Sequence, residues 1–345
     1  MQTALMSLGD LIPTTWTTGP NTEADRYEQL LDQVVWAEEA GFSAVHLGEH
    51  HFSNEFLLSA PPVVLAAIAA RTQSIRLSTA VTLGANLDPV RIAEDYATVD
   101  VLSRGRVEIV FGRGTGFPET FRNFGQDIRK SRDIYVENID LVRRLLSEEN
   151  VHWQGSFRAD LDGVTCRPRP YQPDLPLWIA AGTEESAAHA ADANCALLLP
   201  TTSRMSDEMV PVVNAYRARW DTAEKDPAAQ FVGVSCHIYV DNDEARAKQR
   251  FLKRYEHYCT TANPILANPF DIKTLVSQGP AVFGTPDQCI ERINQMSALY
   301  NHDRQLFMFD FGAVDNSELQ DAIALFASEV YPFVRDLPVR TATPK

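Results

Sequence analysis

The sequence lacks the features that mark membrane, secreted or metal-stapled proteins. No apolar run approaches the ~20 residues that a membrane-spanning helix needs. The five cysteines are far apart and include no Cys-x-x-Cys, so they predict neither a zinc site nor a disulfide framework. The segment Met1 to Asp10 has no basic region of the signal-peptide kind and is interpreted as a first strand. We therefore expect a cytoplasmic protein with reduced thiols.

Positive charge is also scarce. The chain of 345 residues has 31 Lys and Arg against 46 Asp and Glu, a net charge of -15. A nucleic-acid-binding surface needs a basic face, so this balance argues against such a partner and favours a small-molecule ligand. A glycine-rich dinucleotide fingerprint is missing too, because the turn after the first predicted strand reads Gly9-Asp10-Leu11-Ile12-Pro13.

What the sequence does contain is an alternation of short apolar runs and longer amphipathic stretches. Apolar runs without strict alternation are typical of parallel strands buried on both faces. The predicted strands are Thr3–Leu8, Ala44–Gly48, Ile75–Val81, Val107–Gly112, Leu177–Ala181, Ala196–Leu199, Phe231–Val240 and Gln305–Phe311. The predicted helices are Ala24–Ala40, Pro61–Thr72, Pro89–Leu102, Asp127–Leu146, Glu184–Ala193, Ser206–Trp220, Asn242–Tyr258, Pro286–Tyr300 and Ser317–Phe333.

Eight such strands alternating with helices predict an α/β fold, a (β/α)8 TIM barrel, as a single domain over residues 1–345. The structural rival is a doubly wound open sheet, which would need the missing glycine-rich turn. Two segments exceed the minimal barrel. Val151–Gln172 predicts a small hairpin, and Thr260–Thr285 predicts an insertion before the last β/α unit that acts as a mobile lid.

Barrel active sites form at the carboxyl ends of the strands, so the residues there are the candidates for chemistry. Glu49-His50-His51 follows the second predicted strand. Adjacent residues of an extended chain point to opposite faces, so the two histidines are not expected to share a metal, and no metal site is predicted. Either one of the two histidines faces the barrel mouth as an acid/base group while the other is buried, or neither histidine is catalytic.

Two further strand ends are compatible with binding an anion. Arg113 stands between two glycines, where it could grip a phosphate or instead pair with a neighbouring carboxylate. Gly182-Thr183 leads directly into a predicted helix that contains Ser186. Free N–H groups at such a helix start favour an anion, whereas the alternative is an ordinary helix cap formed by Thr183.

Several segments together resemble bacterial luciferase-like proteins over nearly the whole chain. The matching segments are Gly41–Phe52, Asp88–Asp95, Asp100–Arg106, Gly112–Gly114, Asn123–Gly125, Lys130–Arg132, Pro176–Ala181 and Gly284–Pro286. The resemblance implies a barrel that binds FMN as a reduced cosubstrate, delivered by a separate NAD(P)H-dependent flavin reductase.

The same resemblance implies roles for individual residues. His50 matches a histidine thought to act as a base, and Arg113 and Arg132 match arginines at the flavin phosphate. The residues at the remaining phosphate positions are Gly182, Thr183 and Ser186, and Ala80 and Val81 fall where the family has a non-proline cis peptide under the flavin ring. Gly112 and Gly182 stand where luciferase has a cysteine and a glutamate, which argues against light emission.

The implied function is a flavin-dependent monooxygenase that uses reduced FMN and O2 to oxygenate a small organic substrate. Three alternatives remain: a deazaflavin-dependent hydride-transfer enzyme of the same superfamily, a non-catalytic flavin-binding barrel, and an unrelated hydrolase that uses Glu49 and His50. The alanine-rich helix around Ala66–Ala70 predicts pairing across a two-fold axis and therefore a homodimer.

Overall fold

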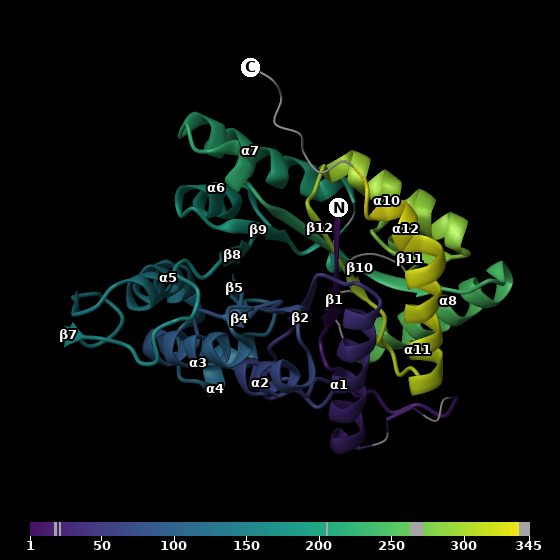
Figure 1. The fold of residues 1–345 in the computed structure, drawn as a ribbon, viewed down its shortest axis with the longest axis horizontal. Helices are drawn as coiled ribbons and strands as arrows, with labels where there is room; N and C mark the ends of the chain where they lie inside the picture. Colours follow the sequence, from purple (N-terminus) through teal and green to yellow (C-terminus); the bar gives the residue numbers. More distant parts are fainter. Residues whose placement is uncertain (17–18, 21, 205, 263–271, 338–345) are drawn as a thin grey trace.

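A closed ring of parallel strands forms the centre of the molecule (Figure 1). The computed structural model describes residues 1–16, 19–20, 22–204, 206–262 and 272–337. Going round the ring, β3, β2, β1, β12, β10, β9, β8 and β5 pair side by side, and a bridge between Leu77 and Val107 closes β3 against β5. The predicted (β/α)8 barrel is confirmed. The ring strands are β1 Gln2–Ser7, β2 Ala44–Leu47, β3 Arg76–Thr79, β5 Ile109–Gly112, β8 Leu177–Ala180, β9 Ala196–Leu199, β10 Val232–Val240 and β12 Arg304–Met308.

Helices surround this ring at the positions that the amphipathic patterns predict. Pro61, Pro89 and Pro286 each lie in the first turn of a helix, where the missing proline N–H costs nothing. The first helix ends just before Gly41, whose φ of 87° is readily adopted only by glycine. The helices are α1 Glu23–Glu39, α2 Pro61–Arg71, α3 Pro89–Ser103, α4 Pro118–Asn123, α5 Ser131–Ser147, α6 Glu184–Asp192, α7 Val210–Thr222, α8 Glu244–Thr261, α9 Ile272–Gln278, α10 Pro286–Tyr300, α11 Asn316–Leu325 and α12 Tyr331–Val334.

Additions to the minimal barrel lie where the sequence departs from the β/α alternation. The predicted hairpin is confirmed as antiparallel β6 (Val151–Trp153) and β7 (Leu161–Val164). Of the predicted insertion 260–285, residues 263–271 lie outside the described residues. Its described part contains the end of α8, helix α9 and strand β11 (Val282–Gly284), which pairs with β10. Movement of this segment as a lid stays a prediction. A second short strand, β4 (Thr82–Leu83), pairs with β5.

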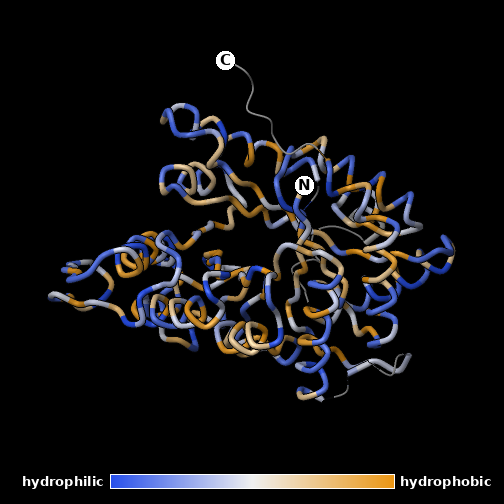
Figure 2. Tube along the Cα trace, in the orientation of Figure 1, coloured by the Kyte–Doolittle hydropathy of each residue, from blue (hydrophilic) through white to orange (hydrophobic). Residues whose placement is uncertain are grey.

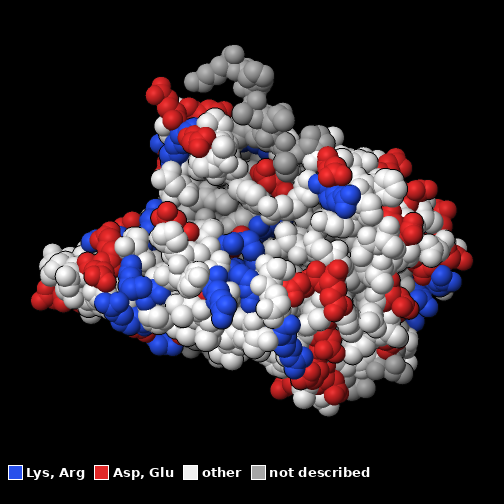
Figure 3. Space-filling view, viewed as in Figure 1, with Lys and Arg blue, Asp and Glu red and all other residues white. Residues whose placement is uncertain are grey.

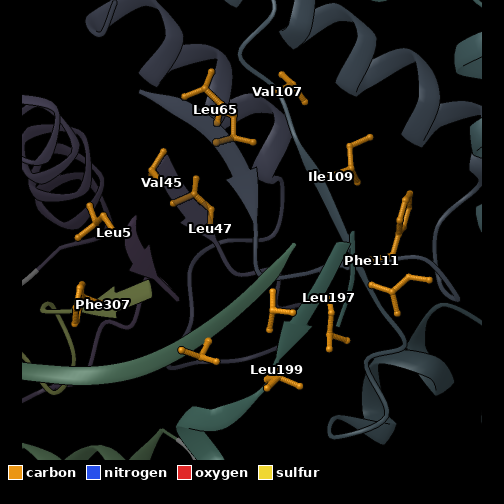
Figure 4. Close-up of a cluster of buried hydrophobic side chains, with 14 of the residues drawn as sticks. Leu5, Val45, Leu47, Leu65, Val107, Ile109, Phe111, Leu197, Leu199 and Phe307 are labelled. Carbon is orange, nitrogen blue, oxygen red and sulfur yellow. The ribbon is translucent and has the colours of Figure 1, made fainter. Parts of the chain in front are cut away.

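Alternate strand residues divide between two apolar clusters. Leu5, Val45 and Phe307 belong to the cluster between strands and helices, which Figure 4 shows with side chains from several strands meeting Leu65 of α2. Ala4 and the strand residues whose side chains point to the opposite face of the sheet belong to the second cluster, which lies inside the barrel and under α8. Figure 2 shows the matching pattern, with hydrophobic strand segments at the centre and mixed polarity along the outer helices.

Charged side chains occupy the amino-terminal end of the barrel interior. Arg304, at the start of β12, donates from Nη1 to the Glu108 carboxylate at 2.6 Å, and both side chains are buried. Arg76 also donates to Glu108. The two arginines hold the pKa of Glu108 at about 2, against the opposing effect of burial. Arg304 further lies over the ring of Trp178 and donates to Nε2 of His46, which burial keeps neutral by lowering its pKa to about 3.

The surface carries the excess of negative charge. Figure 3 shows acidic side chains spread over the helices of the viewed face, while basic side chains gather near its centre. Among the described residues, no helix is both long enough and apolar enough to cross a membrane.

Replacing Glu108 by Gln should destabilise the fold by about 3–5 kcal/mol near neutral pH, because Arg304 then stays buried without its counter-charge. Since the folded pKa of Glu108 lies below its ordinary value of 4.5, the difference should be complete above pH 4.5 and should shrink as the pH falls toward about 2. Denaturant unfolding of both proteins at several pH values measures this difference in the free energy of unfolding.

The matched control is Glu148→Gln, which breaks an exposed pair with Arg144 on the surface of α5. This variant should lose only about 0.3–0.5 kcal/mol, as helical i,i+4 surface pairs do. Equal losses in the two variants would contradict a special role for the buried pair.

Candidate active site

The residues that the sequence singles out line one cavity of about 430 Å³ at the carboxyl ends of the strands. Four successive turns contribute to it, those after β2, β3, β5 and β8. Helix α5 adds Arg132, and the first turn of α6 adds Ser186. The predicted residues that line the cavity are His50, Ala80, Val81, Arg113, Arg132, Gly182, Thr183 and Ser186. The structure therefore brings together all the predicted site positions.

Small residues form one wall of this cavity. The peptide between Ala80 and Val81 is cis, as the resemblance implied. A Cβ atom added at Gly112 would lie 2.0 Å from Cγ2 of Val81, so the backbone of β5 approaches this side chain too closely for any residue but glycine. Ala180 continues the wall on β8. The result is a shallow apolar surface without protruding side chains, suited to a flat ligand.

At another end of the cavity, helix α6 begins. The Oγ1 atom of Thr183 accepts a hydrogen bond from the N–H of Ser186 at 3.2 Å and donates one to its Oγ at 3.0 Å. Thr183 is therefore the N-cap, as the conservative interpretation held. Because both residues also line the cavity, the cap and the anion-site interpretations are compatible. The positive end of the α6 dipole faces the cavity here.

The two predicted arginines differ in whether they form an ion pair. Arg132 pairs with Glu185 of the α6 first turn, with 2.5 Å between Nη1 and Oε2, and both side chains are more than half exposed. Arg113, by contrast, makes no hydrogen bond or ion pair through its guanidinium in the described part of the chain. The alternative of a salt bridge from Arg113 to a neighbouring carboxylate is not found there.

His50 lies on the cavity wall between two aromatic rings. Its imidazole stacks on Phe56 with 4.2 Å between ring centroids and meets Phe117 edge-on at 5.1 Å. Burial lowers the pKa of His50 to about 4, and the neighbouring His51 adds to the effect. His50 is therefore neutral at pH 7. Its Nδ1 is buried and has no hydrogen-bond partner among the residues that the structure describes.

The neighbouring histidine makes a separate set of contacts. Nε2 of His51 lies 2.8 Å from Oε1 of Glu49, and the other carboxylate oxygen accepts the N–H of Leu83 at 3.0 Å. His51 packs edge-on against Phe124, away from the rings around His50. No group of three or more His, Cys, Asp or Glu suited to a metal ion occurs among the described residues.

Sequence reasoning missed part of the cavity wall. The missed polar residues are Tyr135, His189, Thr202 and Arg204. Tyr135 lies on α5, and its hydroxyl donates to the carbonyl of Phe111 at 3.0 Å. Arg204 comes from the loop after β9, which contains no glycine and begins Pro200-Thr201-Thr202. No local signal distinguishes such residues from ordinary surface positions, because only the closed barrel brings these loops to the cavity.

Comparison with known families agrees with this geometry. Residues 6–302 match the family described as luciferase-like monooxygenase. The chain belongs to this family. A solved structure similar over its full length, monooxygenase RslO1 from Streptomyces bottropensis, is 28% identical, with a TM-score of 0.86 and coverage of 96% of this chain and 99% of that one. Fold and family thus agree with the resemblance seen in the sequence.

Curated relatives of the family differ in their cofactors. The uncharacterized protein y4wF of Sinorhizobium fredii is 30% identical over 77% of this chain and 79% of its own length. The oxygenase component of a flavin-dependent trigonelline monooxygenase from Acinetobacter baylyi is 28% identical, over 66% of this chain and 63% of that protein. An F420-dependent glucose-6-phosphate dehydrogenase from Amycolatopsis mediterranei is 29% identical, over 63% and 67%. The chain is thus similar to flavin-dependent and F420-dependent proteins alike.

Proposed function

We propose that this luciferase-like protein is a monooxygenase that binds reduced FMN as a cosubstrate and uses O2 to oxygenate a small organic molecule. The observation that carries the proposal is the presence of two unlike features in one cavity. Arg113, whose guanidinium makes no hydrogen bond or ion pair among the described residues, lines the same cavity as the small-residue wall of Ala80, Val81 and Gly112. A phosphate joined to a planar ring system would match both features.

When bound, reduced FMN supplies two electrons to O2, so that one oxygen atom enters the substrate and the other leaves as water. The protein's own part is binding, orientation and exclusion of water. Arg113, Arg132 and the capped start of α6 with Gly182, Thr183 and Ser186 would hold the phosphate, and the apolar wall would support the ring. Phe56 and Phe117 pack against the imidazole of His50 where it lines the cavity.

In this proposal His50 is the acid/base group. A neutral imidazole with an unengaged nitrogen is ready to accept a proton at pH 7, because burial removes the competing protonated form. His51 is less suited to that task, since its Nε2 is engaged by Glu49.

A separate NAD(P)H-dependent flavin reductase would supply the reduced FMN. Support comes from the missing dinucleotide fingerprint and from the trigonelline relative, which is named as an oxygenase component. A cytoplasmic location fits the five free cysteines, all of them buried. A homodimer through α2 and α3 is supported by the exposed apolar side chains Val63 and Leu102 beside an apolar groove between these helices.

The main alternative is F420-dependent hydride transfer, and the similarity to the F420-dependent Amycolatopsis relative supports it. A flavin-binding barrel without turnover is the second. Stopped-flow mixing of the protein, reduced FMN and candidate substrates with O2, together with a parallel assay that contains F420 in place of FMN, separates all three. Flavin-dependent O2 consumption with product supports the monooxygenase, F420-dependent reduction without O2 supports the first alternative, and binding without turnover supports the second.

Replacing Arg113 by Met should weaken FMN binding about 10- to 100-fold, because a charged hydrogen bond of this kind contributes roughly 1.5–3 kcal/mol. Methionine is similar to the aliphatic part of the arginine side chain and removes the charged guanidinium. Flavin fluorescence titration measures the affinity, and circular dichroism checks the fold. Unchanged affinity in a folded variant would remove Arg113 from the phosphate site.

Replacing His50 by Ala should lower product formation by roughly 100-fold or more while flavin affinity stays near normal, as expected for a lost acid/base group. In the unchanged protein, a His50 pKa of about 4 means that the imidazole stays neutral from pH 8 to pH 5. The acid limb of the rate profile should therefore lie near pH 4, below the value of 6.5 typical of histidine. A limb at 6.5, or full activity of the variant, would refute the role.

The purified protein should not oxidise NADH or NADPH rapidly when only oxidised FMN is added, because it has no dinucleotide-binding fingerprint. Adding any NADH-dependent flavin reductase should start substrate oxygenation. The decrease in absorbance at 340 nm, with and without the reductase, tests the dependence. Rapid oxidation by the protein alone would show that it carries its own reductase activity.

A further inference from the structure

A third arginine reaches the same cavity from an element that no sequence signal marked. Arg204 lies in the loop after β9 and lines the cavity together with Arg113 and Arg132. A Cβ atom placed on Gly182 would lie 3.9 Å from Nη2 of Arg204, so this guanidinium stands beside the turn between β8 and α6. Three separate elements, the ends of β5 and β9 and the start of α5, thus bring a guanidinium to one cavity.

The carboxylates nearby do not neutralise these three charges equally. Arg132 is paired with Glu185 at 2.5 Å. Arg204 has Glu208 at 3.9 Å, which is beyond hydrogen-bond distance, and the Arg204 side chain is half exposed. Arg113 makes no hydrogen bond or ion pair with a carboxylate in the part of the chain that the structure describes, although its charge also acts on Glu185. Two guanidinium groups at this end of the cavity, those of Arg113 and Arg204, therefore have their hydrogen-bonding edges available.

The charge of a phosphate depends on how it is esterified. A phosphomonoester such as that of FMN carries about -1.5 to -2 at pH 7, because its second pKa is about 6. A phosphodiester, the form in which F420 carries its phosphate, has one negative charge. One available arginine balances a diester, whereas two available arginines balance a monoester dianion.

We propose that Arg204 is a further cofactor-binding residue, which together with Arg113 matches the cavity to a terminal phosphomonoester dianion. This inference rests on the proposed function and extends it, because it names a further residue that would recognise the phosphate of the flavin. The available pair lies next to the start of α6, whose helix dipole adds to the attraction for an anion. Arg204 supplies the planar, two-pronged donor that phosphate oxygens favour.

The experiment compares FMN with riboflavin, which has the same ring system and no phosphate. Affinities of both are measured by fluorescence titration for the unchanged protein, Arg204→Met, Arg204→Lys and the control Arg219→Met. Arg219 lies on α7, is half exposed and pairs with Asp192, outside the cavity. Arg204→Met should bind FMN about 10- to 100-fold more weakly and riboflavin within about twofold of the unchanged protein. Lysine should restore part of the loss, and the control should change neither affinity.

A pH series gives a readout that loss of packing alone would not change. The preference of the unchanged protein for FMN over riboflavin should rise from pH 5 to pH 7, as the phosphate loses its second proton near pH 6. Arg204→Met should flatten this rise. An unchanged preference and pH slope in Arg204→Met, with riboflavin binding intact, would overturn the role of Arg204 and leave the proposed function standing. Failure of the unchanged protein to bind either flavin would overturn the proposed function itself, and this inference with it.

Discussion

The burial of one carboxylate between two arginines inside the barrel determines how the rest of the interior is used. Glu108 and Arg76 flank the bridge between Leu77 and Val107, the contact that closes the ring between β3 and β5. Because charged groups fill the amino-terminal end and apolar side chains fill the middle, the open space remains at the carboxyl ends of the strands. There the parallel arrangement brings every connecting loop to the same side. The position of the cavity follows from how the other end is filled.

At the carboxyl ends of the strands, the small size of the side chains leaves the cavity open, and their polarity is less important for this. Gly112 allows Val81 to approach the backbone of β5, and Ala80 and Ala180 leave the wall free of bulk. Larger residues here would fill the space with their own side chains. The charged groups come from loops and helix starts. One cavity therefore has an apolar part and a cationic part.

Much of this could be predicted from the sequence, for physical reasons. Parallel strands buried on both faces appear as apolar runs, so all eight strands were found. Their bounds agree within two residues, except that β12 ends three residues before the predicted Phe311. Short pieces such as α4 and β11 carry too few residues to show a period. The cavity residues were found because barrel sites follow strand ends and because the chain resembles a family. What could not be predicted depends on contacts across the fold. The pairing of Arg132 with Glu185 and the approach of Arg204 to Gly182 join segments whose proximity no local pattern encodes.

The aromatic setting of His50 also governs what happens to a proton after it is taken up. Between the rings of Phe56 and Phe117, an imidazolium has no hydrogen-bond partner for Nδ1 among the described residues. Such a cation holds its proton less tightly than the same ion in solvent, since burial disfavours the charged form. A proton that reaches His50 is therefore passed on readily to an acceptor in the cavity, such as a substrate atom or a water molecule, and the imidazole returns to its neutral form. Packing between the two phenylalanines thus favours an imidazole that transfers protons and does not stay protonated.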